Sequence, residues 1–312
     1  MKRNNKIYIA GHKGMAGSAI LRKLSGAGYS NLLGKTSGEL DLKDRIAVNR
    51  FFKEESPDVV ILAAARVGGI WANNEFPYEF LMHNLQIQNN VIDAAHSYGV
   101  KKFIFLGSSC IYPKYSPQPI KEEYLLSGEL EPTNQWYSLA KITGIKACEA
   151  LRRQYQKDFV CLMPTNLYGP GDNFDLQTSH VLPAMLRKFH EAKNRDHASV
   201  KLWGTGSPMR EFMHVDDLAS AVLFTLEHKL EETIYNVGTG KDLPIDELAV
   251  LIQQIIGHQG KIIWDHSKPD GTPQKLLSVE KLKNKGWQSE IALEEGIRNT
   301  YDWYNMQQNQ NL

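Results

Sequence analysis

The fold of this 312-residue chain is decided by the stretch Lys6-Ile7-Tyr8-Ile9-Ala10-Gly11-His12-Lys13-Gly14-Met15-Ala16-Gly17. Its first half is a short β-branched and apolar run, which is typical of a buried strand. Three glycines spaced three apart follow it and open an amphipathic stretch that reaches residue 28. Backbone without a Cβ can approach a pyrophosphate at a helix N-terminus. The pattern predicts a dinucleotide-binding loop over residues 11–17, and a tight turn with close helix–strand packing is the alternative.

The alternation of short apolar runs and longer amphipathic stretches continues through the first half of the chain. Strands are expected at residues 59–63, 102–107 and 159–163, and helices at 15–28, 79–98 and 136–156. Such βαβ units predict an α/β fold, a Rossmann-type doubly wound parallel sheet. A helix at 180–193 and a strand at 200–203 predict a smaller C-terminal α/β substrate lobe. We therefore expect one domain over 1–165, with a segment near 216–237 returning to it, and a second over 166–312.

The composition argues against several classes of function. Lys and Arg total 36 against 35 Asp and Glu, with no long block of one sign, so we expect neither a nucleic acid nor a membrane as a partner. The apolar run 59–65 is far shorter than the about 18 residues that span a bilayer. The run 7–10 is too short for a signal-peptide core. Cys110, Cys148 and Cys161 have an odd count and no metal-ligand spacing, which favours a reducing cytoplasm and no metal ion.

Tyr137 and Lys141 lie four residues apart on a predicted helix, downstream of the run 106–110, LGSSC. Residues i and i+4 share one helical face, so the phenol and the ammonium can reach one substrate oxygen and one cofactor. A phenol with an ordinary pKa of about 10 transfers protons poorly at neutral pH. We expect Lys141 to lower that pKa while the Ser108 hydroxyl steadies a substrate carbonyl. Together these residues predict a hydride-transfer site for a ketone.

Two lysines bear on which dinucleotide is bound. In sites that prefer NAD, an acid about 20 residues beyond the glycines binds the ribose 2′-hydroxyl. Here Gly34 and Lys35 end the predicted second strand, and Lys13 lies in the glycine loop. Two cations and no carboxylate at these points favour the 2′-phosphate of NADPH, and solvated surface lysines are the alternative. The residues that come where the adenine and the ribose-pyrophosphate would lie are Asp41, Leu42, Ala63, Ala64 and Ala65.

Longer segments carry a resemblance to a known family. They are residues 9–15 (IAGHKGM), 63–70 (AAARVGGI), 106–113 (LGSSCIYP), 163–170 (MPTNLYGP), 173–180 (NFDLQTSH), 209–217 (MREFMHVDD) and 268–273 (KPDGTP). Over almost its whole length the chain resembles the extended short-chain dehydrogenase/reductases, and among them the epimerase-reductases of GDP-4-keto-6-deoxy-D-mannose. The resemblance implies that C3 and C5 of this sugar are inverted and that its C4 ketone is then reduced by NADPH, giving GDP-L-fucose.

The resemblance also implies a set of cofactor contacts and an oligomeric state. Besides the five residues placed at the adenine and the ribose-pyrophosphate, the contacts are Gly11, His12, Lys13, Gly14, Met15, Ala16, Gly17, Lys35, Leu106, Gly107, Lys141, Pro164, Thr165, Asn166, Leu167 and His180. The enzymes that the chain resembles form homodimers in which two helices of each subunit meet. The corresponding helices here are those predicted at 79–98 and 136–156.

Inverting a carbon beside a ketone requires a base and an acid on opposite faces of the ring. The enolate that forms carries its charge on O4, where Ser108 and Tyr137 can donate hydrogen bonds. Cys110 follows Ser108 by two residues, so an extended segment would point both side chains into one cleft. There the Cys110 thiolate could be the base, with Lys141 or a positive nicotinamide favouring the ionised form of the thiol. His180 begins a predicted helix and can give a proton near neutral pH. The resemblance implies these roles, and packing or helix capping are the alternatives.

The second lobe offers cations and an aromatic surface for a diphosphate sugar. The resemblance assigns nucleotide binding to Lys188, Trp203, Arg210 and Asp270. Arg210 suits a pyrophosphate, and Trp203 suits an apolar wall beside the base or ribose. A surface arginine and a core tryptophan are the alternatives.

Two other functions are compatible with this fold. One is a nucleotide-sugar 4-epimerase or dehydratase that keeps NAD bound and recycles the hydride. Such enzymes lack the pairing of Cys110 with His180, and they usually have an acid after the second strand. The other is a redox-sensing protein that binds a dinucleotide without catalysis. The presence of Ser108, Tyr137 and Lys141 argues against it.

Overall fold

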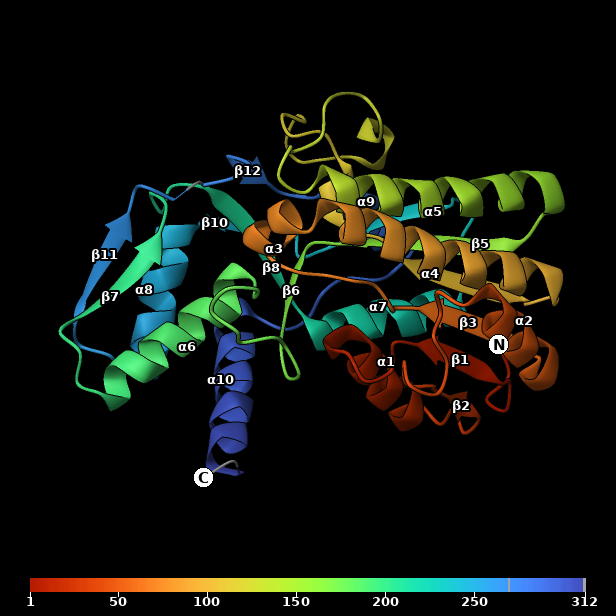
Figure 1. The fold of residues 1–312 in the computed structure, drawn as a ribbon, viewed down its shortest axis with the longest axis horizontal. Coiled ribbons are helices and arrows are strands. Elements are labelled where there is room, and N and C mark those ends of the chain that lie inside the picture. Colours follow the sequence, from red (N-terminus) through yellow and green to blue (C-terminus); the bar gives the residue numbers. More distant parts are fainter. Residues whose placement is uncertain (269, 311–312) are drawn as a thin grey trace.

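In the computed structural model, a six-stranded parallel sheet with helices on both faces forms one lobe, and a smaller α/β lobe lies beside it (Figure 1). The strand order is β2-β1-β3-β4-β5-β9. The structure describes residues 1–268 and 270–310. Pro269, which belongs to one of the segments carrying the resemblance, and residues 311–312 of the second predicted domain lie outside the described residues. The predicted Rossmann-type fold is confirmed.

The elements of the sheet lobe agree with the sequence prediction to within about two residues at most ends. Its strands are β1 (Ile7–Ala10), β2 (Leu32–Leu33), β3 (Val59–Leu62), β4 (Lys102–Leu106), β5 (Asp158–Pro164) and β9 (Ile234–Val237). Its helices are α1 (Met15–Gly26), α2 (Arg45–Glu55), α3 (Ile70–Glu75), α4 (Pro77–Ser97), η1 (Ser109–Ile111), η2 (Glu122–Tyr124), α5 (Gln135–Tyr155) and α7 (Val215–Glu227).

The sheet separates two hydrophobic cores, which is why its central strands are buried throughout. Phe52 of α2, Ile92 of α4 and Ile145 of α5 pack on one face. Ile20 of α1 and Val222 of α7 pack on the other. Every residue of β1 and β3 is buried, as expected for parallel strands covered on both sides. The apolar strand runs therefore place the sheet between two helical layers.

The second lobe is built around β8 (Met209–His214). Its other elements are β6 (Asn166–Tyr168), α6 (Val181–Asn194), β7 (Ser199–Trp203), β10 (Asp242–Pro244), α8 (Ile245–Ile256), β11 (Lys261–Asp265), β12 (Gln274–Lys275) and α10 (Leu293–Gln310). Strand β8 pairs with β6 and β12 in parallel and with β10 in the antiparallel direction. Helices α6, α8 and α10 contribute Phe189, Ile252 and Ile297 to a third core.

The chain crosses between the lobes more than once. Strand β9 returns to pair with β5, with Tyr235 opposite Leu162. Residues 276–287, which include the short helix α9 (Glu280–Lys283), return as well, because Leu277 is buried in one core of the sheet lobe and Leu282 and Trp287 in the other. Backbone hydrogen bonds join Ile120 to residues 276 and 278 at the start of this returning segment. The two lobes are thus held by several passes of the chain, which fixes β12 beside the edge of the sheet.

Candidate active site

The candidate site lies at the carboxyl edge of the sheet. Gly11, Ala63, Gly107 and Thr165 follow β1, β3, β4 and β5 directly. Because neighbouring parallel strands end at the same edge, these positions face one crevice. The predicted groups at these strand ends are therefore brought together.

Glycine is required at two positions of the loop over residues 11–17. Gly11 has φ +87°, and a Cβ there would lie 2.8 Å from the Ala64 nitrogen. A Cβ on Gly17 would overlap the carbonyl of Gly11. Gly14 begins α1 without a side-chain cap, so the first N–H groups of the helix have no side chain bonding to them. The Nδ1 atom of His12, also in this loop, is buried and has no hydrogen-bond partner among the described residues. The loop therefore fits a pyrophosphate-bearing dinucleotide.

Lys13 and Lys35 both act electrostatically on Glu39, a carboxylate beyond the end of β2 that the sequence patterns did not predict as a site residue. Glu39 accepts hydrogen bonds from the nitrogen and the hydroxyl of Thr36 at 2.8 and 2.7 Å. These bonds and the charges of Lys35 and Lys13 lower the pKa of Glu39. Positions 13, 34 and 35 carry no carboxylate, as predicted, and Glu39 adds one close to the two lysines. Glu39 lies four residues beyond Lys35, and a Thr-x-x-Glu turn was the signal for it.

Ser108, Tyr137 and Lys141 meet between β4 and α5. The hydroxyl of Tyr137 is hydrogen-bonded with Ser108. The Lys141 Nζ lies 5.7 Å from the centre of the Tyr137 ring and donates to the carbonyl of Leu106 at 2.7 Å. Lys141 is buried, and burial lowers its pKa to about 7. An amine with this pKa can exchange a proton at neutral pH.

The pKa of Tyr137 differs from the sequence expectation. Burial is the largest cause and raises this pKa, the negative charge of Cys110 raises it further, and the hydrogen bond with Ser108 lowers it. Lys141 was expected to lower it, but its ammonium is directed to a backbone carbonyl. Tyr137 is therefore held as a neutral phenol, which is the form that can donate a proton to a substrate oxygen.

Cys110 lies beside this group, but on a different local structure from the one predicted. Residues 109–111 form the helix η1, and the Ser108 Oγ accepts from the Cys110 nitrogen at 3.2 Å. The expectation of an extended segment is wrong, because the Ser108 side chain caps a turn there. The Cys110 Sγ is 3.6 Å from the Nζ of Lys275, a residue that was not among the predicted site residues. Cys148 and Cys161 are fully buried in the sheet lobe.

His180 is placed by the start of α6. It is the residue before the first turn of that helix, and its side chain makes no cap hydrogen bond. Burial is the largest cause that lowers the pKa of His180, and the charge of Lys275 lowers it further. Lys275 thus lies near both Cys110 and His180. No sequence motif marks it, because β12 is only two residues long.

The predicted nucleotide-binding residues gather around Trp203 at the end of β7. Trp203 is 47% exposed, and the Nζ atoms of Lys188 and Lys268 lie 5.6 and 5.4 Å from its ring. Arg210 donates to the carbonyl of Asp270 at 3.3 Å. The Asp270 carboxylate accepts from the nitrogen and hydroxyl of Thr205 at 2.8 and 2.9 Å. Trp203 is exposed to a ligand, whereas Arg210 donates to backbone carbonyls and Asp270 fixes the neighbouring loop.

The cofactor positions after β5 connect the sheet to the second lobe. The Thr165 hydroxyl and the Asn166 amide donate to the carbonyl of Glu211 at 3.1 and 2.8 Å. Pro164 is buried, and Leu167 packs on the α1 and α7 side of the sheet.

The cofactor positions near the adenine end are more open. Asp41 is exposed and lies 3.6 Å from the ammonium of Lys43. Leu42 and Ala64 are partly buried against the sheet lobe's core.

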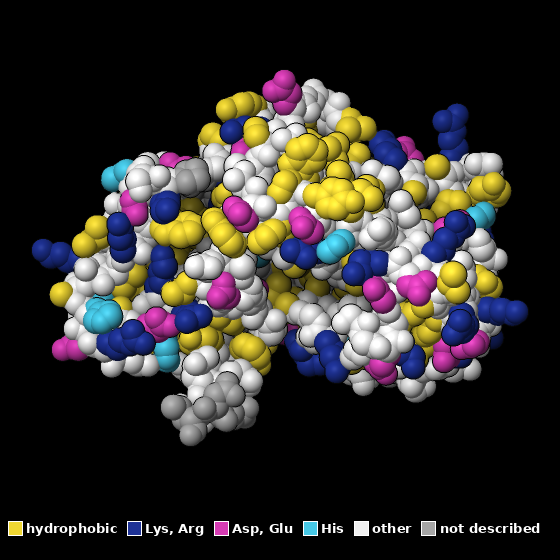
Figure 2. Space-filling view, viewed as in Figure 1, with side chains coloured by type: hydrophobic (Ala, Val, Ile, Leu, Met, Phe, Trp, Pro, Cys, Tyr) yellow, Lys and Arg dark blue, Asp and Glu magenta, His cyan; other side chains and the backbone are white. Residues whose placement is uncertain are grey.

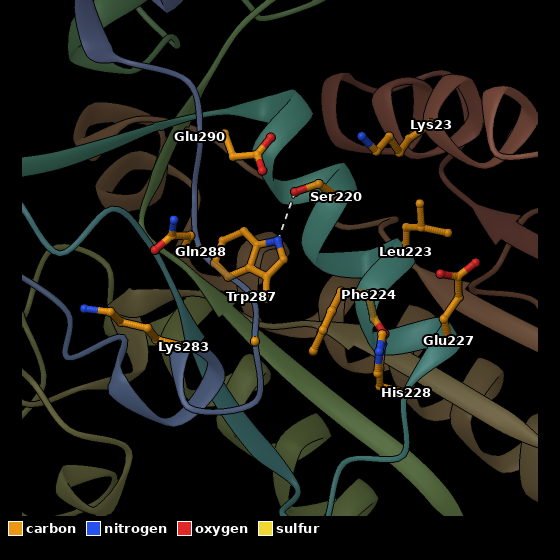
Figure 3. Close-up of a pocket in the computed structure, with 11 residues that line it drawn as sticks. Lys23, Ser220, Leu223, Phe224, Glu227, His228, Lys283, Trp287, Gln288 and Glu290 are labelled. Carbon is orange, nitrogen blue, oxygen red and sulfur yellow. Dashed lines mark hydrogen bonds between the residues drawn. The ribbon is translucent and has the colours of Figure 1, made fainter.

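A separate cavity of about 620 Å³ lies between α1, α7 and the segment after α9 (Figure 3). Trp287 donates to the Ser220 hydroxyl at 2.9 Å across it, and the rings of Phe224 and His228 stack 4.0 Å apart. It contains none of the predicted catalytic or cofactor residues. We therefore assign the chemistry to the edge of the sheet.

Within residues 1–268 and 270–310, no three His, Cys, Asp or Glu side chains are grouped so that they could hold a metal ion. Among the helices of these ranges, none has the length and apolar character needed to cross a membrane.

The glycine loop on a parallel sheet, with Ser108, Tyr137 and Lys141 at its edge, defines a dinucleotide-dependent enzyme of the short-chain dehydrogenase/reductase class. The family model described as the NAD dependent epimerase/dehydratase family matches residues 7–238, and the chain belongs to this family.

Three relatives show how close the similarity is. The chain is 55% identical to the probable GDP-L-fucose synthase 1 of Oryza sativa subsp. japonica, over 97% of this chain and 92% of the rice protein. It is 52% identical to the GDP-L-fucose synthase of Escherichia coli strain K12, over 96% of both chains. A solved structure of a GDP-mannoheptose C4 reductase from Campylobacter jejuni with NADP bound is 40% identical, with a TM-score of 0.90 over 98% of this chain and 99% of that one.

Proposed function

We propose that this chain is an NADPH-dependent enzyme that epimerises GDP-4-keto-6-deoxy-D-mannose at C3 and C5 and then reduces C4 to give GDP-L-fucose. The observation that carries the proposal is the grouping of two kinds of residue at one site. A reductase set, Ser108, Tyr137 and Lys141, lies beside Cys110, and Cys110 shares the neighbour Lys275 with His180. The 52–55% identity to proteins named GDP-L-fucose synthase supports this substrate.

For the reduction, Ser108 and Tyr137 bind the C4 carbonyl oxygen. Bound NADPH supplies the hydride that is delivered to C4. The neutral phenol of Tyr137 donates its proton to the oxygen as the alkoxide charge develops. Lys141, whose pKa is about 7, is suited to hold the cofactor ribose and to return a proton towards Tyr137 at neutral pH.

For the epimerisations, Cys110 as a thiolate removes a proton from C3 or C5. The enolate charge on O4 is stabilised by the same hydroxyls of Ser108 and Tyr137. His180 returns a proton to the opposite face of the carbon. One oxyanion site thereby serves both halves of the reaction.

The remaining predicted residues bind the two nucleotides. The loop over residues 11–17, the strand-end residues already described and Lys35 hold NADPH, with Lys13 and Lys35 at its 2′-phosphate. On the GDP side, Arg210 and Lys188 bind the diphosphate and Trp203 lies against the base or ribose. Asp270 supports Arg210 through its carbonyl. In this arrangement the sheet lobe binds the dinucleotide and the second lobe binds the GDP-sugar.

We also propose that the protein is a homodimer joined through α4 and α5. The two helices pack side by side, and Figure 2 shows hydrophobic side chains gathered over α3 and the first turns of α4 and α5. Tyr78, Trp136 and Leu139 are 68, 38 and 39% exposed there. A second copy would cover them.

All three cysteines are free thiols, which supports a role in the reducing cytoplasm.

The test is to supply the keto sugar and NADPH and to follow both halves of the reaction. The parent protein oxidises NADPH, forms GDP-L-fucose and incorporates solvent deuterium at C3 and C5. Cys110→Ser is expected to lose the deuterium incorporation while slowly reducing the unepimerised sugar. Tyr137→Phe is expected to lose reduction most severely while some exchange survives, because Ser108 still supports the enolate. Deuterium exchange by Cys110→Ser at the parent rate would refute the assignment of the base.

A further inference from the structure

A cation lies against the proposed base of the epimerisation. The Lys275 Nζ is 3.6 Å from the Cys110 Sγ, across 165 residues of sequence. Both side chains are half-buried. A thiolate and an ammonium at this distance attract each other strongly, because the partly enclosed site screens them less than bulk water does.

Lys275 is held in place from both sides of its strand. It pairs with Arg210 of β8 in the parallel register, and Gln274 pairs with Met209. On the other side, the Gln118 side chain accepts from the Leu276 nitrogen at 2.8 Å and donates to the Gln274 carbonyl at 3.2 Å. The ammonium is therefore presented by a fixed backbone.

Within the part of the chain that the structure describes, charged or titratable groups of three elements act on Cys110. Lys275 approaches from β12, Arg210 from β8 and Tyr137 from α5. Arg210 directs its guanidinium to the carbonyls of Met209 and Asp270, at 2.8 and 3.3 Å. Of these groups, Lys275 is the one with a hydrogen-bond contact to the sulfur among the described residues.

We infer that Lys275 is a positioning residue that pairs with the Cys110 thiolate and couples its protonation to that of His180. The inference rests on the proposed function for the roles of Cys110 and His180. While Cys110 is ionised, its charge balances Lys275, so an imidazolium at His180 is tolerated. Once the sulfur takes a proton, the unbalanced ammonium repels the imidazolium.

This coupling between Cys110 and His180 sets the order of the two proton transfers in each inversion. The thiolate forms an S–H bond with the hydrogen of C3 or C5, and the electron pair of the broken C–H bond moves to O4. Lys275 then opposes the charge on His180, which releases its proton to the other face of the same carbon as the ketone re-forms. The thiol afterwards loses its proton to water and the imidazole takes one, which restores the starting state.

The experiment measures alkylation of Cys110 by iodoacetamide against pH in the NADP-bound protein, with the modified cysteine identified by mass spectrometry. Cys148 and Cys161 are fully buried, so Cys110 is the expected target. Lys275→Met should move the half-maximal alkylation to higher pH and slow alkylation about tenfold at neutral pH, since an opposite charge at this range favours the ionised form. Lys275→Arg should restore most of the rate. Lys241→Met, which removes an exposed lysine elsewhere in the second lobe, should match the parent.

A second readout separates a positioning role from a merely structural one. In Lys275→Met the acidic limb of the deuterium-exchange profile should shift to higher pH, while NADPH affinity and the thermal midpoint stay near the parent values. If Lys275→Met does not fold, Lys275→Gln is used in the same assay. An unchanged alkylation profile in the folded variant overturns the inference. If alkylation shifts while Cys110→Ser still exchanges deuterium, the pair is upheld and the proposed base is rejected.

Discussion

Replacing Lys141 by methionine is expected to stabilise the cofactor-free protein while abolishing reduction. Lys141 is 3% exposed, and burial lowers its pKa from 10.5 to about 7. Since one pKa unit corresponds to about 1.4 kcal/mol, burying the ammonium costs about 5 kcal/mol of folding free energy. The lost hydrogen bond to the Leu106 carbonyl offsets about 3 kcal/mol of that. The expected net gain in unfolding free energy for Lys141→Met is about 2 kcal/mol.

The gain must depend on pH in a defined direction. A lysine whose folded-state pKa is lowered carries its full penalty below about pH 7 and loses it as the pH rises towards 10.5. Urea unfolding should therefore show the largest difference between Lys141→Met and the parent below pH 7 and a much smaller one near pH 10. Lys146→Met is the control, because this exposed lysine lies on the same helix. A variant less stable than the parent below pH 7, or a gain independent of pH, would refute the reasoning.

Further predictions concern the cofactor, the substrate, the dimer and the second lobe. Alanine at both Lys13 and Lys35 should weaken NADPH binding about tenfold and leave NADH nearly unchanged; equal losses would sink the 2′-phosphate assignment. Trp203→Ala should raise the KM for the GDP-sugar about tenfold with little change in kcat, and an unaltered KM would contradict it. Leu139→Lys should shift sedimentation from dimer to monomer, and a parent that is already monomeric at micromolar concentration would disprove the interface. Glu211→Gln should lower the unfolding free energy by about 2 kcal/mol, because its buried oxygens accept three backbone N–H groups; denaturation curves that coincide would count against this.

Most of the sheet lobe follows from patterns within about 20 residues. The apolar strands, the glycines at 11 and 17 and the four-residue spacing of Tyr137 and Lys141 are local features, and each fixes a backbone form or a helical face. The segments that carry the family resemblance predicted the nucleotide-binding residues Trp203, Arg210 and Asp270, and the structure places Arg210 against the carbonyl of Asp270. The extended form predicted at Cys110 is wrong, because the Ser108 side chain caps a turn there.

The sequence by itself determined the parallel sheet and the form of the glycine loop, and it predicted the reductase residues, because hydrophobic periodicity and glycine sterics act over short distances along the chain. Only the tertiary structure decided that Lys275 lies against Cys110, that Glu39 shares the region of Lys13 and Lys35, and that residues 276–287 return to the sheet lobe. Those contacts depend on strand pairing and on packing between distant segments, such as β12 with β8. The charges that surround the proposed base are therefore set by how the two lobes are joined.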